Sequence, residues 1–118
     1  MGKPVDLLLR FEAVQHRDFL LALADHAIAF NGNEVVIAHN ALVGIEVECG
    51  DDPARSIANN LTKDRAAGLS CIVFAVMPKQ VRTATQYLSR LDEKLDGIFV
   101  VDALQLLDAL RSARKDAK

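Results

Sequence analysis

The spacing of apolar residues changes between strand-like and helix-like periods along the second half of the chain. Residues 71–77 form a continuous apolar run, which is typical of a strand buried on both faces, and residues 98–101 form a shorter one. The segments 53–67, 78–94 and 103–114 have helical spacing instead. Because alternating strands and helices indicate parallel βαβ units with right-handed crossovers, we predict an α/β fold.

Residues that favour helix ends support these boundaries. Asp52 is a predicted N-cap, with Pro53 at the first helical position. Gly68 is the predicted stop of the same helix, and Asp102 the predicted cap of the last one. The charged, alanine-rich residues 112–118 are expected to form a loose tail.

The first half of the chain is less regular. Residues 16–30 have helical spacing with an Asn-Gly stop at 31–32, whereas residues 5–14 fit a strand or a helix equally well. Residues 34–38 and 42–49 are predicted strands, and the three residues between them are few enough for an antiparallel hairpin. The predicted sheet is therefore mixed.

The apolar residues of this hairpin select a register. Pairing Val35 with Ile45, and Ile37 with Val43, places all of these side chains on one face of the hairpin. A slip of one residue would turn every side chain of one strand to the other face, so the apolar pattern discriminates strongly between registers.

The same register gathers carboxylates on the opposite face. It places Glu34 directly opposite Glu46, with Glu48 one pleat further along. Like charges opposite one another destabilise a sheet, so such a cluster requires a bound cation or open solvent. Oxygen ligands on a partly covered sheet suit Mg²⁺. A solvated outer face is the alternative, and it stays open here.

Composition limits the classes of function. A chain of 118 residues suits one domain, and its formal net charge of -2 provides no overall basic field for nucleic acid. Acids such as Asp64 are interspersed among the basic residues, which favours a solvated face over a nucleic-acid groove. Cys49 and Cys71 lie in apolar runs and are predicted core thiols. No apolar run approaches the roughly 20 residues of a membrane span, so we expect a cytoplasmic protein.

Residues 32–37, followed by residues 44–50, resemble the core of the PD-(D/E)XK nuclease superfamily, which includes restriction endonucleases and Holliday-junction resolvases. The resemblance covers residues 15–110 and implies a single nuclease-like domain over 1–118. The implied fold is restriction endonuclease-like: an antiparallel hairpin followed by βαβα units, forming a mixed sheet flanked by helices. The implied activity is divalent-metal-dependent hydrolysis of DNA phosphodiesters.

The resemblance also implies roles for individual residues. Glu34 stands where the motif has its Asp, Glu46 stands where it has its second acid, and Glu48 occupies the usual position of the catalytic lysine. The sequence is most similar to subfamilies whose lysine has moved to the following helix. Lys63 is then the displaced lysine, and Asn60 is a supporting residue one turn before it.

The implied metal is Mg²⁺ or Mn²⁺, held by Glu34, Glu46 and the carbonyl oxygen of Val47. The helical wheel disagrees with one part of this picture. The predicted buried stripe of the helix places Asn60 at its edge but turns Lys63 well away from the sheet.

Three hypotheses follow. The first is an active nuclease, which would have DNA as its partner and could act as a homodimer. The second is a catalytically degenerate binding or accessory module of the same fold, part of a larger DNA-processing or mobile-element protein. The missing motif lysine and the acidic balance favour this second reading. The third is an unrelated small α/β domain with three glutamates on a hairpin.

Overall fold

The computed structural model describes residues 7–10, 25–30, 42–48, 50, 52–91 and 95–116. Their strands form one five-stranded sheet in the order β1-β3-β4-β5-β2. The strands are β1 (Leu7–Arg10), β2 (Ile28–Ala29), β3 (Leu42–Glu48), β4 (Cys71–Val76) and β5 (Ile98–Asp102). The three central strands are parallel, whereas β1 and β2 run antiparallel to their neighbours at the two edges. The sheet is therefore mixed, as predicted.

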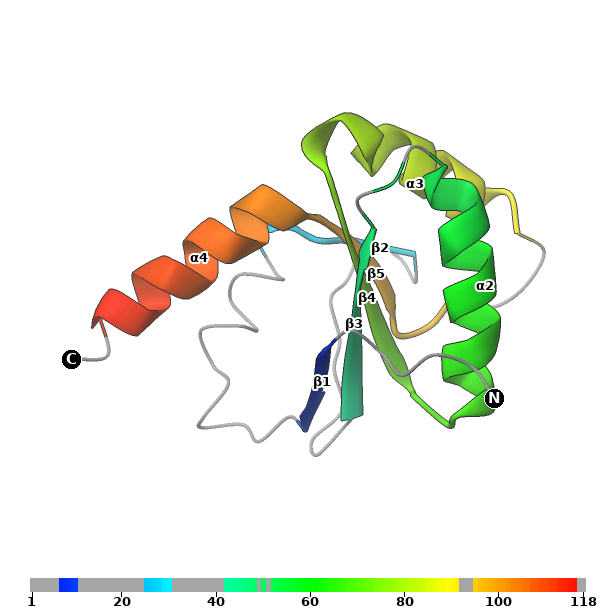
Figure 1. Ribbon diagram of the computed structural model, residues 1–118, viewed down its shortest axis with the longest axis horizontal. Helices are drawn as coiled ribbons and strands as arrows, with labels where there is room; N and C mark the ends of the chain where they lie inside the picture. Colours follow the sequence, from blue (N-terminus) through cyan, green and yellow to red (C-terminus); the bar gives the residue numbers. More distant parts are fainter. Residues whose placement is uncertain are drawn as a thin grey trace.

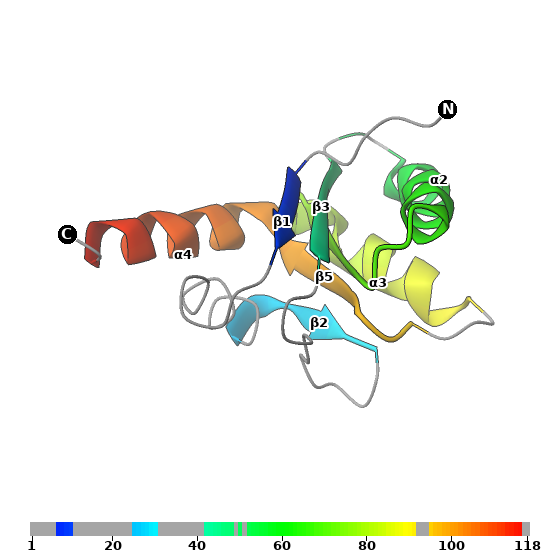
Figure 2. The same ribbon diagram turned by 90° about the horizontal axis from the view of Figure 1, so that it is seen from below.

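Helices lie on both sides of this sheet (Figure 1). They are α2 (Pro53–Ala66), α3 (Val81–Ser89), which follows the short 3-10 helix η1 (Pro78–Gln80), and α4 (Ala103–Asp116). Both α2 and α3 cover one face, whereas α4 starts at the other face and projects beyond the sheet (Figures 1 and 2). The prediction of an α/β domain built from parallel βαβ units is confirmed.

The predicted helix caps are present. The side chain of Asp52 accepts a hydrogen bond from the backbone N–H of Arg55 at 3.2 Å, and Pro53 occupies the first turn of α2. The side chain of Asp102 accepts hydrogen bonds from the N–H groups of Leu104 and Gln105 at 2.8 and 3.2 Å. Local sequence therefore fixes where both helices begin.

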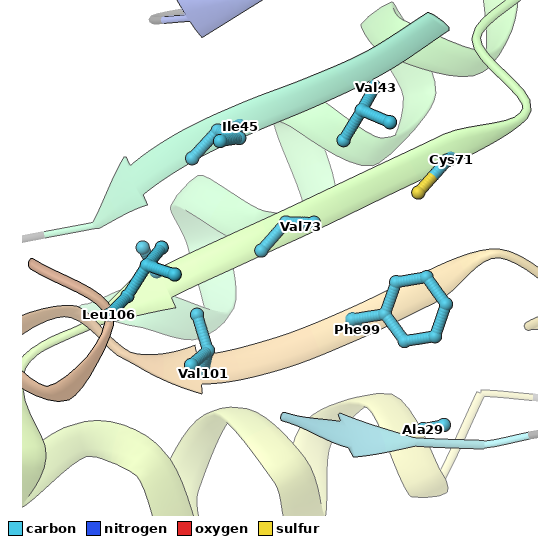
Figure 3. Packing of buried hydrophobic residues seen from close by; sticks show 9 residues of the cluster. Ala29, Val43, Ile45, Cys71, Val73, Phe99, Val101 and Leu106 are labelled. Carbon is cyan, nitrogen blue, oxygen red and sulfur yellow. The ribbon is translucent and has the colours of Figure 1, made fainter. Parts of the chain in front are cut away.

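Apolar side chains form one buried cluster on each face of the sheet. All six residues of β4 are buried, which confirms the prediction of a strand covered on both sides. The cluster beneath α2 and α3 consists of Ile57, Leu61, Ile72, Phe74, Val76, Ala84, Leu88, Ile98 and Val100. The cluster on the α4 face is shown in Figure 3 and includes Val43, Ile45, Cys71, Val73, Phe99 and Leu106. Burial raises the pKa of the Cys71 thiol to about 12, as expected for an inert core thiol. Cys49 lies outside the described residues.

The predicted register of the hairpin is wrong. Residues 42–45 of β3 pair with β1 on one side, with Leu7 opposite Ile45 and Leu9 opposite Val43, and β4 occupies the other side. A strand has only two edges, and both edges of β3 at Val43 and Ile45 are occupied by β1 and β4. The predicted strand at residues 34–38 lies outside the described residues.

Two further boundaries differ from the sequence prediction. Ile28 and Ala29 form the edge strand β2 rather than the end of a helix, because they pair with Val100 and Phe99 of β5. A tertiary pairing thus overrides the helical spacing of this segment. At the other end of the chain, α4 continues to Asp116, through most of the segment expected to be a loose tail.

Two glycines with positive φ provide a matched test of the packing at the end of the sheet. Gly68 and Gly97 have φ of 84° and 77°, but a Cβ at Gly68 would meet no neighbouring atom, whereas a Cβ at Gly97 would collide with the carbonyl oxygen of Ser70. Gly68→Ala should therefore lower the free energy of unfolding by about 1–2 kcal/mol, from backbone strain alone. Gly97→Ala should lower it by more than about 3 kcal/mol, because the backbone must also shift. Chemical denaturation measures both, and equal losses would contradict the packing described here.

Candidate functional site

Strand β3 turns two glutamates toward the helical layer. In the parallel register with β4, Glu46 lies opposite Phe74 and Glu48 lies opposite Val76, and both of those partners belong to the cluster beneath α2 and α3. Because side chains alternate along a strand, both carboxylates face α2 rather than solvent. Their exposed fractions are 1% for Glu46 and 5% for Glu48. The prediction that the two glutamates share one face is confirmed. The alternative that this face is exposed to solvent is wrong, because both side chains are buried.

Helix α2 supplies a polar partner for each glutamate. The side-chain amide of Asn60 donates a hydrogen bond to Glu48 Oε1 at 2.7 Å, and Lys63 Nζ lies 3.1 Å from Glu46 Oε2. The spacing follows from element geometry. Two residues of strand advance about 6.6 Å, and three residues of helix advance about 4.5 Å. Because a crossover helix runs antiparallel to its strands, the two pairs form successive contacts between β3 and α2.

Lys63 does not point away from the sheet, as the helical wheel had indicated. Its Cα lies off the buried stripe, but its long aliphatic side chain reaches around the helix and delivers the ammonium to Glu46. The Lys63 side chain keeps an exposed fraction of 19%, so it connects the buried site with the surface. The buried carboxylate of Glu46 explains this path, because a charge removed from water requires a partner of opposite sign.

Asp64 is the residue of this site that the sequence analysis misses. It was assigned to a solvated face, but its exposed fraction is 1% and its carboxylate Oδ1 lies 3.6 Å from Lys63 Nζ. Neither of its carboxylate oxygens accepts a hydrogen bond from any described residue. A signal was available: Asp64 follows the buried residues Ile57 and Leu61 by seven and three positions, which places it on the buried face of the helix.

The surroundings change the acidity of two of these groups. Burial raises the pKa of the Asp64 carboxyl to about 6, the neighbouring Glu46 carboxylate adds to this effect, and Lys63 opposes it. Burial alone would lower the pKa of Lys63, but its contact with Glu46 and the charges of Glu46 and Asp64 outweigh burial and raise that pKa above 10.5. Lys63 is therefore an ammonium at neutral pH and is unsuited to act as a general base.

The remaining predicted site residues stand apart from this cluster. Glu34 lies outside the described residues. Val47 lies between the two glutamates in the sequence. Its side chain therefore points to the other face of the sheet, where it is 47% exposed. The structure thus brings together Glu46, Glu48, Asn60 and Lys63 from the predicted set and adds Asp64.

The donor atoms suit a hard divalent cation. Across the described parts of the chain, no group of three or more Asp, Glu, His or Cys side chains is arranged to hold a metal. Mg²⁺ typically takes only one or two carboxylates and keeps several waters. The Asp64 carboxylate is buried beside Glu46, with the Lys63 ammonium 3.6 Å from its Oδ1, and this is an environment that a cation would stabilise.

The fold and the site define a small α/β domain with a buried, mixed-charge cluster between strand β3 and the following crossover helix α2. No protein-family model matches the sequence, and no curated protein or solved structure is significantly similar to it. Of the helices that the structure describes, none has both the length and the apolar character needed to cross a bilayer.

The raised pKa of Asp64 predicts a specific dependence of stability on pH. Because this pKa is higher in the folded chain than in the unfolded chain, the contribution of Asp64 is fully favourable below about pH 4 and is lost as the pH rises through about 6. A shift of this size corresponds to roughly 3 kcal/mol at most. Asp64→Asn should therefore be more stable than the wild type at pH 7.5 by up to this amount, and the difference should nearly vanish at pH 4. Urea unfolding at several pH values measures the difference, and parallel curves would contradict the assignment.

The contact between Asn60 and Glu48 provides a second test. Asn60→Ala should lower the free energy of unfolding by about 1–2 kcal/mol, because it removes a hydrogen bond to a buried carboxylate. The neighbouring Asn59 is exposed on the same helix, so Asn59→Ala should change stability by less than about 0.5 kcal/mol. Equal effects in the two variants would mean that the contact does not stabilise the fold.

Proposed function

We propose that this domain is a divalent-metal-dependent nuclease of the PD-(D/E)XK type that hydrolyses DNA phosphodiesters. The observation that carries the proposal is the 3.1 Å contact between Lys63 Nζ and Glu46 Oε2. The resemblance nominates Lys63 as a catalytic lysine moved from the strand to the following helix, and such a lysine must reach the motif acid. Here it does so, although the two residues are separated by 17 positions (63 − 46) and lie on different elements.

Each residue of the cluster has a role in this proposal. Glu46 and the carbonyl oxygen of Val47 would hold the cation; Glu34, which the resemblance also names as a ligand, lies outside the described residues. When bound, Mg²⁺ or Mn²⁺ would lower the pKa of a coordinated water and polarise the phosphate. The Lys63 ammonium stays protonated, so its positive charge can stabilise the negative charge that develops on the phosphate oxygens. Asn60 holds Glu48, which occupies the usual lysine position, in place.

The sheet also supports the proposal. The acid-bearing strand β3 has an antiparallel neighbour on one side and begins a parallel crossover on the other. A restriction endonuclease-like core is also a mixed sheet, but the antiparallel partner of its acid-bearing strand would be the other strand of the hairpin. The antiparallel neighbour of residues 42–45 is β1, however, and not the strand predicted at residues 34–38.

One observation favours a second candidate, the catalytically degenerate binding module. Glu46 is 1% exposed, and the Lys63 ammonium already neutralises it. A buried ion pair of this kind could have a purely structural role, which is to hold α2 against β3. In this reading the domain would be an accessory module of a larger DNA-processing protein.

Cleavage assays separate the two candidates. The purified domain should nick or linearise supercoiled plasmid DNA with Mg²⁺ or Mn²⁺ and be inactive with a chelator. Glu46→Gln and Lys63→Met should each reduce the rate by about 10²-fold or more, because each removes a charge that acts on the reacting phosphate. Lys79→Met is the matched control for the lysine, since Lys79 is exposed on the 3-10 helix η1, outside the cluster.

Circular dichroism should show that all the variants remain folded. Absence of cleavage by the wild type with either metal, together with retention of DNA in a mobility-shift assay, would favour the binding module. Full activity in Lys63→Met would contradict the role of the displaced lysine.

A further inference from the structure

We propose that the Glu46 and Asp64 carboxylates form a divalent-cation site in which the Lys63 ammonium acts as an internal, displaceable counter-ion. This inference deepens the proposed function and rests on it for its biological purpose. It concerns binding alone, however, and its test contains no DNA. It assigns Asp64 as a cation ligand and gives Lys63 a second role.

The geometry places one cation between two carboxylates. Lys63 Nζ lies 3.1 Å from Glu46 Oε2 and 3.6 Å from Asp64 Oδ1, so the ammonium bridges an acid on β3 and an acid on α2. The Asp64 side chain is 1% exposed, and neither of its oxygens accepts a hydrogen bond from a described residue. A buried carboxylate whose Oδ1 lies 3.6 Å from the Lys63 ammonium is only weakly compensated, which indicates that a stronger partner can occupy this position.

The Lys63 ammonium carries one positive charge and contacts two carboxylates. A divalent cation would supply one positive charge for each of them. Hard oxygen donors favour Mg²⁺ or Mn²⁺ over softer metals, and such ions accept one or two protein carboxylates together with water.

Lys63 also provides a path into the buried site. Its side chain is 19% exposed, whereas Glu46 and Asp64 are each 1% exposed, so it is the part of the cluster that reaches solvent. Rotation of its flexible side chain toward solvent would vacate the position of the ammonium for the cation. The released ammonium would then face solvent beside the bound cation, where a phosphate could approach.

The test is a competition between Lys63 and Mn²⁺, measured by isothermal titration calorimetry on the folded protein without DNA. Lys63→Met removes the ammonium but keeps most of the side-chain length. If Lys63 competes with the cation, this variant should bind Mn²⁺ at least about 10-fold more tightly than the wild type. Lys63→Arg keeps the positive charge and should bind no more tightly than the wild type. Thermal stabilisation by Mn²⁺ should rank the variants in the same order.

The double variant Lys63→Met/Asp64→Asn tests the role of Asp64 and should lose the gain in affinity. The proposal is overturned if Lys63→Met binds Mn²⁺ no more tightly than the wild type, or if the double variant retains the gain. The two proposals can fail separately. Competition for Mn²⁺ without DNA cleavage would refute the nuclease alone, whereas cleavage without competition would refute the counter-ion role of Lys63 alone.

Discussion

The contact between the Lys63 ammonium and the Glu46 carboxylate connects strand β3 to helix α2 through the interior of the domain. The surrounding helical face of the sheet is built from Ile57, Phe74 and other apolar side chains, which exclude water from the acids. In that environment an isolated carboxylate would be strongly destabilising, so burial of Glu46 requires a cation close by. The apolar packing and the ion pair therefore depend on each other: the packing buries the acid, and the acid fixes the course of the lysine.

Stability alone does not explain a buried cluster of charged side chains. Replacing a buried ion pair with well-packed apolar residues is often neutral or stabilising, because desolvation of the charges offsets their attraction. Here a third charged group, Asp64, is buried beside the same ammonium, 3.6 Å from it, which adds to the cost of desolvation. Perturbed, buried titratable groups that converge on one point are typical of functional sites. The position of the cluster near the end of β3 agrees with the general location of ligand sites in open α/β sheets.

Much of the second half of the fold could be predicted from the sequence because its signals are local. Asp52 and Asp102 cap helices through their immediate neighbours, and the continuous apolar run of β4 is typical of a strand buried on both faces. The pairing partner of β3 could not be predicted in the same way. An apolar pattern defines which face of a strand is buried, but several apolar segments can satisfy it, and β1 does so here. The face shared by Glu46 and Glu48 was predictable for the same reason, since it depends only on alternation.

The charge of the cluster also constrains the order of events in any phosphate chemistry at this site. With both acids ionised, the Glu46 and Asp64 carboxylates would each repel a phosphodiester. The ammonium meanwhile is directed inward, toward the acids, and not toward a substrate. A cation that neutralised the acids would remove the repulsion and free the ammonium in one step. If the proposed function holds, binding of the cation would have to precede productive binding of DNA, because the carboxylates would repel the phosphates until the cation neutralises them.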